Sequence, residues 1–150
     1  MASGAIQTKG LSRSTIDKFY TNPLVAEECL KIFKKYVPLK KDDLILEPSA
    51  GNGSFIPGIK ALSKNYLFYD LEPEHDEIIK QDYLLFDPAD IQAKYGNIYV
   101  IGNPPFGLRG HLALNFINHS HSFADYVCFI LPQLFESDGK GSPRKRVKGY

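Results

Sequence analysis

One short segment has the residue types needed to hold a planar amino group: Asn103-Pro104-Pro105-Phe106. It follows an apolar run over residues 97–102. Its two prolines fix φ and lack an N–H donor, so the segment cannot continue a strand or begin a regular helical turn. We therefore expect a stiff loop at a strand end. Its carbonyl oxygens would accept N–H bonds from an amino group, and its aromatic ring would stack on a planar ligand.

A second chemically informative segment is the turn over residues 47–53. Gly51 and Gly53 allow the backbone to approach a ligand closely, and the helix expected after them offers free N–H groups. The spacing lacks the third glycine of the dinucleotide-binding fingerprint. Glu47, at the start of the turn, would repel a pyrophosphate but suits a cationic or zwitterionic ligand. A plain strand-to-helix turn without a ligand stays open as the alternative.

Two aspartates follow further predicted strands. Asp70 comes about twenty residues after the glycine turn, where a carboxylate can accept both hydroxyl hydrogens of a ribose. Glu72 competes for that role, and capping a helix is the alternative for either residue. Asp82 is placed to accept a hydrogen bond from an adenine amino group, although a simple turn residue explains it as well.

The elements that must position these residues alternate between strands and helices. Continuous apolar runs predict strands at residues 43–47, 66–70, 98–101 and 126–131, with a further strand at or beside 83–86. Helical spacing predicts helices over residues 23–36, 55–62, 74–79 and 111–122. This alternation predicts an α/β fold with a mostly parallel, doubly wound sheet that is covered on both faces. Ligands of such folds bind at the carboxyl ends of the strands.

The composition is that of one globular domain. The chain has 150 residues, 43% of them hydrophobic, and a formal net charge of +1, so the chain as a whole does not indicate nucleic-acid binding. We expect Cys29 and Cys128 to be reduced, buried thiols. His119 and His121 lack a nearby third ligand, so we predict no metal site. Without a signal peptide or membrane-spanning run, we expect a soluble protein of the cytoplasm, or of a host cell if the source is viral.

Taken together, these segments resemble the S-adenosylmethionine-dependent amino-methyltransferase family, in particular the adenine-specific DNA methyltransferases. The run Glu47-Pro-Ser-Ala-Gly-Asn-Gly53-Ser-Phe55 resembles the first cofactor motif of that family, and Asn103-Pro-Pro-Phe106 resembles its catalytic motif. Residues 17–21 followed by Pro23 resemble its N-terminal cofactor segment, and residues 129–132 with Phe135 resemble the strand after catalysis. The resemblance extends from about Lys18 to Phe135.

The resemblance implies a Rossmann-like class I methyltransferase fold and assigns roles to single residues. It implies an S-adenosylmethionine site formed by Tyr20, Thr21, Glu47, Ser49, Gly51, Gly53, Asp70, Leu71, Asp82 and Tyr83. Asp70 would hold the ribose and Asp82 the adenine amino group, while Leu71 and Tyr83 would pack on the adenine ring. The implied catalytic residues are Asn103, Pro104, Pro105 and Phe106. The Asn103 side-chain oxygen and the Pro104 carbonyl would accept hydrogen bonds from the target amino group, and Phe106 would stack on the target base.

The chain also departs from the family pattern. We predict a loose N-terminal arm over residues 1–14, a catalytic and cofactor-binding domain over 15–136, and a polar, basic tail over 137–150. The usual antiparallel hairpin after the fifth strand and a separate target-recognition domain are not recognisable. A truncated chain, or a partner chain or second copy that completes the open sheet edge, would account for this.

Three functions remain open from the sequence. The first is methylation of adenine in nucleic acid, with DNA favoured over RNA and no membrane partner. The second is methylation of a glutamine side-chain amide in a protein, which also presents a planar NH2 group. The third is a catalytically idle cofactor-binding half of a larger assembly. The basic tail favours nucleic acid.

Overall fold

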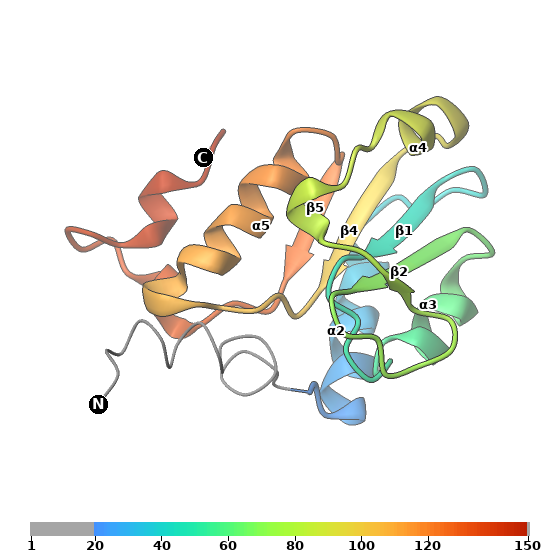
Figure 1. Ribbon diagram of the computed structural model, residues 1–150, viewed down its shortest axis with the longest axis horizontal. Coiled ribbons are helices and arrows are strands. Elements are labelled where there is room, and N and C mark those ends of the chain that lie inside the picture. The colour runs from blue at the N-terminus through green and yellow to red at the C-terminus, as the bar shows by residue number, and fades with distance from the viewer. Residues whose placement is uncertain (1–19, 150) are drawn as a thin grey trace.

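The structure, a computed structural model that describes residues 20–149, contains one sheet of five parallel strands (Figure 1). The strand order is β3-β2-β1-β4-β5. Leu46 of β1 is paired with Leu67 on one side and with Val100 on the other, which makes β1 the central strand. The strands are β1 (Leu44–Glu47), β2 (Tyr66–Asp70), β3 (Ile79–Lys80), β4 (Ile98–Gly102) and β5 (Tyr126–Phe129).

Helices cover both faces of this sheet. They are α2 (Pro23–Tyr36), α3 (Ile56–Leu62), α4 (Ala89–Lys94) and α5 (His111–His121). The start of α2 is fixed by its own sequence, because the Asn22 side chain accepts a hydrogen bond from the Leu24 N–H and Pro23 occupies the first turn. Figure 1 shows α2 and α3 on one side of the strands and α5 on the other.

Side chains from alternate positions of the strands form a hydrophobic core on each face, as the pleat of a strand requires. One core joins Ile45, Phe68 and Ile101 to Leu30 of α2 and Ile59 of α3. The core on the opposite face joins strand residues to α4 and α5 and includes Leu44, Leu46, Val100, Ile91 and Phe116. Because both faces of the sheet are covered, the central strands consist almost entirely of apolar residues.

The predicted α/β class and the doubly wound parallel sheet are confirmed. The helix predicted over residues 23–36 has those bounds, and the strand predicted over 66–70 does too. The strands predicted at 43–47, 98–101 and 126–131 and the helices at 55–62 and 111–122 are present with ends shifted by one or two residues. Within residues 20–149 every strand pair is parallel. Both cysteines are free, and each is half-buried.

The prediction was only partly right between residues 74 and 86. The helix expected over 74–79 is absent, and residues 79–80 form the short edge strand β3. This is the strand expected at or beside residues 83–86, but Tyr83–Leu85 themselves form a 3-10 turn, η2. The Asp82 side chain accepts a hydrogen bond from the Leu84 N–H and caps this turn, which directs the Tyr83 ring into the core. The short helix α4 was not predicted.

The C-terminal segment also differs from the expected loose tail. Residues 137–149 fold back along α5 and include a 3-10 turn, η5 (Pro143–Arg146) (Figure 1). The Asn118 side chain of α5 donates to the Arg146 carbonyl (3.2 Å) and accepts from the Lys148 N–H (2.9 Å). Tertiary hydrogen bonds therefore order a segment whose composition alone is typical of a solvated tail.

Two further expectations concern the ends of the chain and membranes. The predicted arm over residues 1–14 lies outside the described residues, as do residues 15–19 of the predicted domain. No helix within residues 20–149 is long and apolar enough to cross a membrane.

Candidate active site

The candidate site lies where the order of the strands reverses. β1 and β4 are neighbours in the sheet, but the chain leaves β1 toward β2 and reaches β4 only after β3. Connections on opposite sides of the sheet leave a crevice at the carboxyl ends of such a strand pair, and ligands bind there. Glu47 ends β1, and Asn103 directly follows β4. The two most informative sequence segments are thus brought to one edge of the sheet.

Three hydrogen bonds tie together segments that are far apart in sequence. The Asn103 side-chain N–H donates to the Thr21 hydroxyl at 3.1 Å, and the Ser49 hydroxyl donates to the Asn103 carbonyl at 3.1 Å. The Ser54 hydroxyl donates to the Thr21 carbonyl at 2.7 Å. The segment before α2, the turn after β1 and the loop after β4 therefore form one unit, which brings Thr21, Ser49 and Asn103 together.

The loop after β4 presents acceptors that no described residue uses. Neither the Asn103 side-chain oxygen nor the Pro104 carbonyl accepts a hydrogen bond from any residue between 20 and 149. Both prolines are buried, which fixes the loop. The Phe106 ring is half-buried, and the Phe106 carbonyl accepts hydrogen bonds from Leu112 and Ala113 at the start of α5. The structure thus fixes the loop at both ends and leaves its acceptors available.

The glycine turn after β1 is held by Asp70 at the end of β2. Gly51 and Gly53 have φ values of +59° and +91°, which side chains other than glycine rarely adopt. One Asp70 carboxylate oxygen accepts the Gly51 N–H and the other accepts the Glu72 N–H, both at 2.8 Å. Asp70 is therefore a support of the turn as well as the predicted ribose acceptor, a role that sequence reasoning did not assign.

Tyr20 lies over this turn. A β-carbon built on Gly51 would meet the Tyr20 ring at 3.6 Å, and the Tyr20 hydroxyl donates to the Glu74 carboxylate. Glu74 also donates its backbone N–H to the Gly51 carbonyl at 3.2 Å. Tyr20 is thus placed beside the predicted cofactor turn. Glu74 was not predicted at the site, and no sequence signal distinguishes it from the neighbouring acids.

Glu47 is the most unusual group of the site. Its side chain is only 1% exposed, and one carboxylate oxygen, Oε1, has no hydrogen-bond partner among the described residues. A polar atom buried in this way costs free energy unless a ligand or partner satisfies it. Burial, with the nearby Asp70 carboxylate, raises the pKa of Glu47 to about 8.

Gly102 makes room for this carboxyl group. Its φ is +151°, and a β-carbon at this position would lie 3.0 Å from Cγ and 3.3 Å from Oε2 of Glu47. Any side chain at 102 would therefore press on Glu47. Sequence reasoning missed Gly102, although a glycine directly before the Asn-Pro-Pro-Phe loop was a signal of close approach.

The raised pKa of Glu47 predicts a dependence of stability on pH. Between the ordinary pKa of 4.5 and about 8 the folded protein keeps the Glu47 proton and the unfolded chain loses it. The free energy of unfolding should therefore fall as the pH rises through this interval, by an amount on the order of a few kcal/mol. Glu47→Gln keeps the shape without the charge and should flatten the profile. Urea unfolding of both proteins at pH 5 and pH 8 measures the difference, and parallel profiles would contradict the assignment.

Not every predicted cofactor residue points into this crevice. The Tyr83 side chain is 1% exposed, its hydroxyl lies 2.6 Å from the Ser120 hydroxyl, and its ring contacts Phe116. The predicted packing of this ring on a bound adenine is therefore wrong, because the ring is part of the core beneath α5. Leu71 and Asp82 are half-buried next to the ends of β2 and β3, and Asp82 caps η2.

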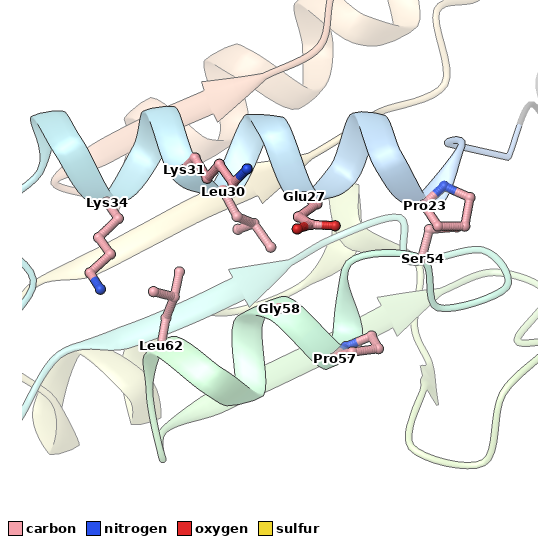
Figure 2. A pocket seen from close by; sticks show the side chains of 9 residues that line it. All are labelled: Pro23, Glu27, Leu30, Lys31, Lys34, Ser54, Pro57, Gly58 and Leu62. Atoms are coloured by element: carbon pink, nitrogen blue, oxygen red, sulfur yellow. The ribbon is translucent and has the colours of Figure 1, made fainter.

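A separate cavity of 480 Å³ lies between α2 and α3, beside the candidate site (Figure 2). Figure 2 shows Leu30 and Leu62 projecting into it from the two helices, with Glu27 and Lys34 along α2. Ser54 also lines it. The cavity does not include the loop after β4, so it is not the space where an amino group would meet Asn103.

No protein family model matches this sequence, and no curated protein matches it. The assignment of a function therefore depends on the site itself. Among the described residues no group of three or more His, Cys, Asp or Glu side chains could hold a metal ion.

Proposed function

We propose that this chain is an S-adenosylmethionine-dependent methyltransferase that acts on the exocyclic amino group of adenine in nucleic acid, with DNA favoured over RNA. The proposed fold is the Rossmann-like class I methyltransferase fold, for which the strand order β3-β2-β1-β4-β5 is suitable. Asn103 Oδ1 and Pro104 O, two neighbouring acceptors that no residue between 20 and 149 uses, are the observation that carries this proposal.

The residues around the glycine turn fit the proposed cofactor. The unpartnered Oε1 of Glu47 suits a cationic ligand group, and the turn has two glycines at positive φ where a backbone can approach a ligand closely. Asp70 stands at the neighbouring strand end for the ribose hydroxyls, with lone pairs beyond those used by Gly51 and Glu72. Tyr20 and Thr21 would cover the methionine part of the bound cofactor.

When bound, S-adenosylmethionine supplies a methyl group on a sulfonium sulfur, which keeps the bonding electron pair as the methyl group moves to the amino nitrogen. The Asn103 side-chain oxygen and the Pro104 carbonyl accept the two N–H bonds of the amino group. These bonds orient the nitrogen lone pair and stabilise the positive charge that develops on nitrogen. The nitrogen then loses one of its protons to water.

A stiff loop is required for this role. Because Pro104 and Pro105 are buried and the Phe106 carbonyl accepts hydrogen bonds from the first turn of α5, the acceptors are held in place before a target arrives. The Asn103 side-chain NH2 group donates to the Thr21 hydroxyl, which leaves the side-chain oxygen of Asn103 to accept a hydrogen bond from the target amino group. Phe106 would stack on an unpaired or flipped base.

Calorimetric titration with S-adenosylmethionine tests the first half of the proposal. We expect saturable binding, and S-adenosylhomocysteine should compete for the same site. Glu47→Gln, which cannot give up a proton to provide a carboxylate beside the bound sulfonium cation, should weaken binding. Absence of heat at millimolar cofactor, in a protein shown to be folded by circular dichroism, would overturn the proposal.

A further inference from the structure

The C-terminal turn, which we define as residues 139–149, concentrates the positive charge of the chain. Residues 139–149 contain five basic residues and no acid, whereas the whole chain has a net charge of only +1. The remainder of the chain therefore carries a net negative charge. A local concentration of positive charge on one segment is typical of a surface that binds a polyanion.

This segment is a folded part of the protein. The Asn118 side chain bonds to the backbone of both Arg146 and Lys148, and Val147 packs against a hydrophobic cluster that includes Ile117 of α5. At the other end the buried Ser142 donates its hydroxyl to the Leu134 carbonyl at 3.3 Å. The basic side chains thus project from a backbone whose position is already fixed.

The turn is coupled to the loop that carries the proposed methyl acceptor site. Phe106 of that loop and Val147 of the turn pack against the same hydrophobic cluster, formed by Ala113, Leu114, Ile117 and Phe135. Gly110, just after the loop, lies directly against the Phe135 ring, because a β-carbon at Gly110 would be 2.9 Å from that ring. One small core therefore sets the position of the basic turn relative to the proposed acceptor site.

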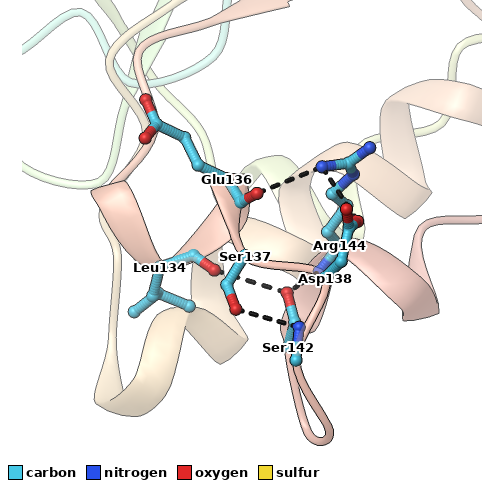
Figure 3. A network of polar contacts seen from close by, with 7 residues as sticks. Leu134, Glu136, Ser137, Asp138, Ser142 and Arg144 are labelled. Carbon is cyan, nitrogen blue, oxygen red and sulfur yellow. Dashed lines mark hydrogen bonds and ion pairs between the residues drawn. The ribbon is translucent and has the colours of Figure 1, made fainter.

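Of the five basic residues of the turn, Arg144 supports the fold and the other four, Lys140 among them, are exposed. Figure 3 shows the Arg144 guanidinium bonded to the Glu136 carbonyl and to the Asp138 carboxylate, both at 3.1 Å. Lys145, Arg146 and Lys148 are exposed, and none forms an ion pair with another residue in the described range. Arg144 therefore organises the turn, and the three cations that follow it, Lys145, Arg146 and Lys148, are available to bind a ligand.

We propose that Lys145, Arg146 and Lys148 bind the phosphate backbone of the nucleic-acid strand that delivers the target base, an inference that rests on the proposed function. Phosphate contacts position a strand without reading its sequence. Lysine and arginine on a fixed backbone lose less conformational freedom on binding than they would on a solvated tail. A protein substrate with a target glutamine amide has no comparable repeating anion.

Binding of a labelled single-stranded DNA, followed by fluorescence anisotropy between about 50 and 200 mM salt, tests this inference. We expect tight binding by the wild type. The triple variant Lys145→Ala, Arg146→Ala, Lys148→Ala should bind at least about 10-fold more weakly, and the slope of log K against log salt should fall by about 2, as expected for three phosphate contacts on a single strand. The matched control removes three exposed lysines near the far end of α2: Lys34→Ala, Lys35→Ala, Lys41→Ala.

The outcomes separate this inference from the proposed function. Calorimetric titration with S-adenosylmethionine should give the same affinity for the wild type and both triple variants. If the wild type did not bind S-adenosylmethionine, that result would count against the proposed function and not against the phosphate contacts of the turn. A loss of DNA affinity confined to the C-terminal variant supports the inference. An equal loss in both variants, no loss in either, or binding of the wild type to anionic phospholipid vesicles but not to DNA would overturn it.

Discussion

Replacing Asn103 with alanine is expected to lower the rate of methyl transfer by about 100-fold or more, the loss typical of removing one pre-positioned hydrogen-bonding group from a reacting centre. The reason is that Asn103 Oδ1, which accepts no hydrogen bond from residues 20–149, is one of the two acceptors that we assign to the incoming amino group. Affinity for S-adenosylmethionine should stay within a few-fold of the wild type, because Asn103 is not one of the proposed cofactor residues and most of these lie on the turns after β1 and β2. Single-turnover transfer and calorimetric titration measure the two quantities separately.

A second variant examines how Asn103 is oriented. Thr21→Val removes the hydroxyl that accepts the Asn103 N–H at 3.1 Å but leaves the Asn103 oxygen in place. We expect a smaller loss of transfer than in Asn103→Ala, because the amide can rotate but is still present.

A large loss of cofactor affinity in Asn103→Ala, with transfer at saturating cofactor unchanged, would contradict the role that we give to Asn103.

Replacing Asp70 with alanine should show the opposite pattern, with cofactor affinity weakened by about 10- to 100-fold. Two effects combine. The proposed charge-assisted bonds to the ribose hydroxyls are lost, at roughly 1.5–3 kcal/mol for a hydrogen bond to a charged group. The Gly51 and Glu72 N–H groups also lose the carboxylate that holds the turn, at 2.8 Å each. Calorimetric titration gives the affinity, and a thermal melt records the cost to the fold.

Two controls separate the parts of the Asp70 effect. Asp70→Asn keeps one carbonyl acceptor for the turn and should recover much of the stability but less of the affinity. Glu72→Gln changes the exposed neighbouring acid, which is the alternative candidate for binding the ribose. This change should leave the affinity for S-adenosylmethionine nearly unchanged. If Glu72→Gln weakened the cofactor more than Asp70→Ala did, the ribose contact would belong to Glu72.

Much of the fold follows from local sequence patterns. Asn22 and Pro23 set the start of α2, and the apolar run over residues 66–70 has the bounds of β2, so both elements were predicted with their actual limits. The failures lie where tertiary packing decides. Tyr83 belongs to an apolar run that is also typical of a strand, but residues 83–85 form a 3-10 turn that buries the Tyr83 ring beneath α5. The local sequence does not predict this packing.

The same distinction holds at the candidate site. The turn that contains Ser49 and the loop that contains Asn103 were predicted at the carboxyl ends of strands, where ligand-binding residues of a doubly wound sheet gather, and a hydrogen bond joins them. Thr21, which only the family resemblance assigned to the cofactor, also bonds to Asn103. The support that Asp70 gives to the glycine turn and the anchoring of the basic turn by Asn118 were not predictable. Both depend on hydrogen bonds between segments whose relative position only the folded chain defines.

The most direct test of the central claim follows the transferred methyl group itself. The protein is incubated with unmethylated DNA, RNA of matched sequence and a protein mixture, each with S-adenosylmethionine that carries a deuterated methyl group, and the digested products are analysed by mass spectrometry. The account predicts deuterated methyl on the exocyclic nitrogen of adenine, most abundant in DNA and lost in Asn103→Ala. Label on cytosine or on glutamine, or no label on any substrate despite cofactor binding, would contradict it.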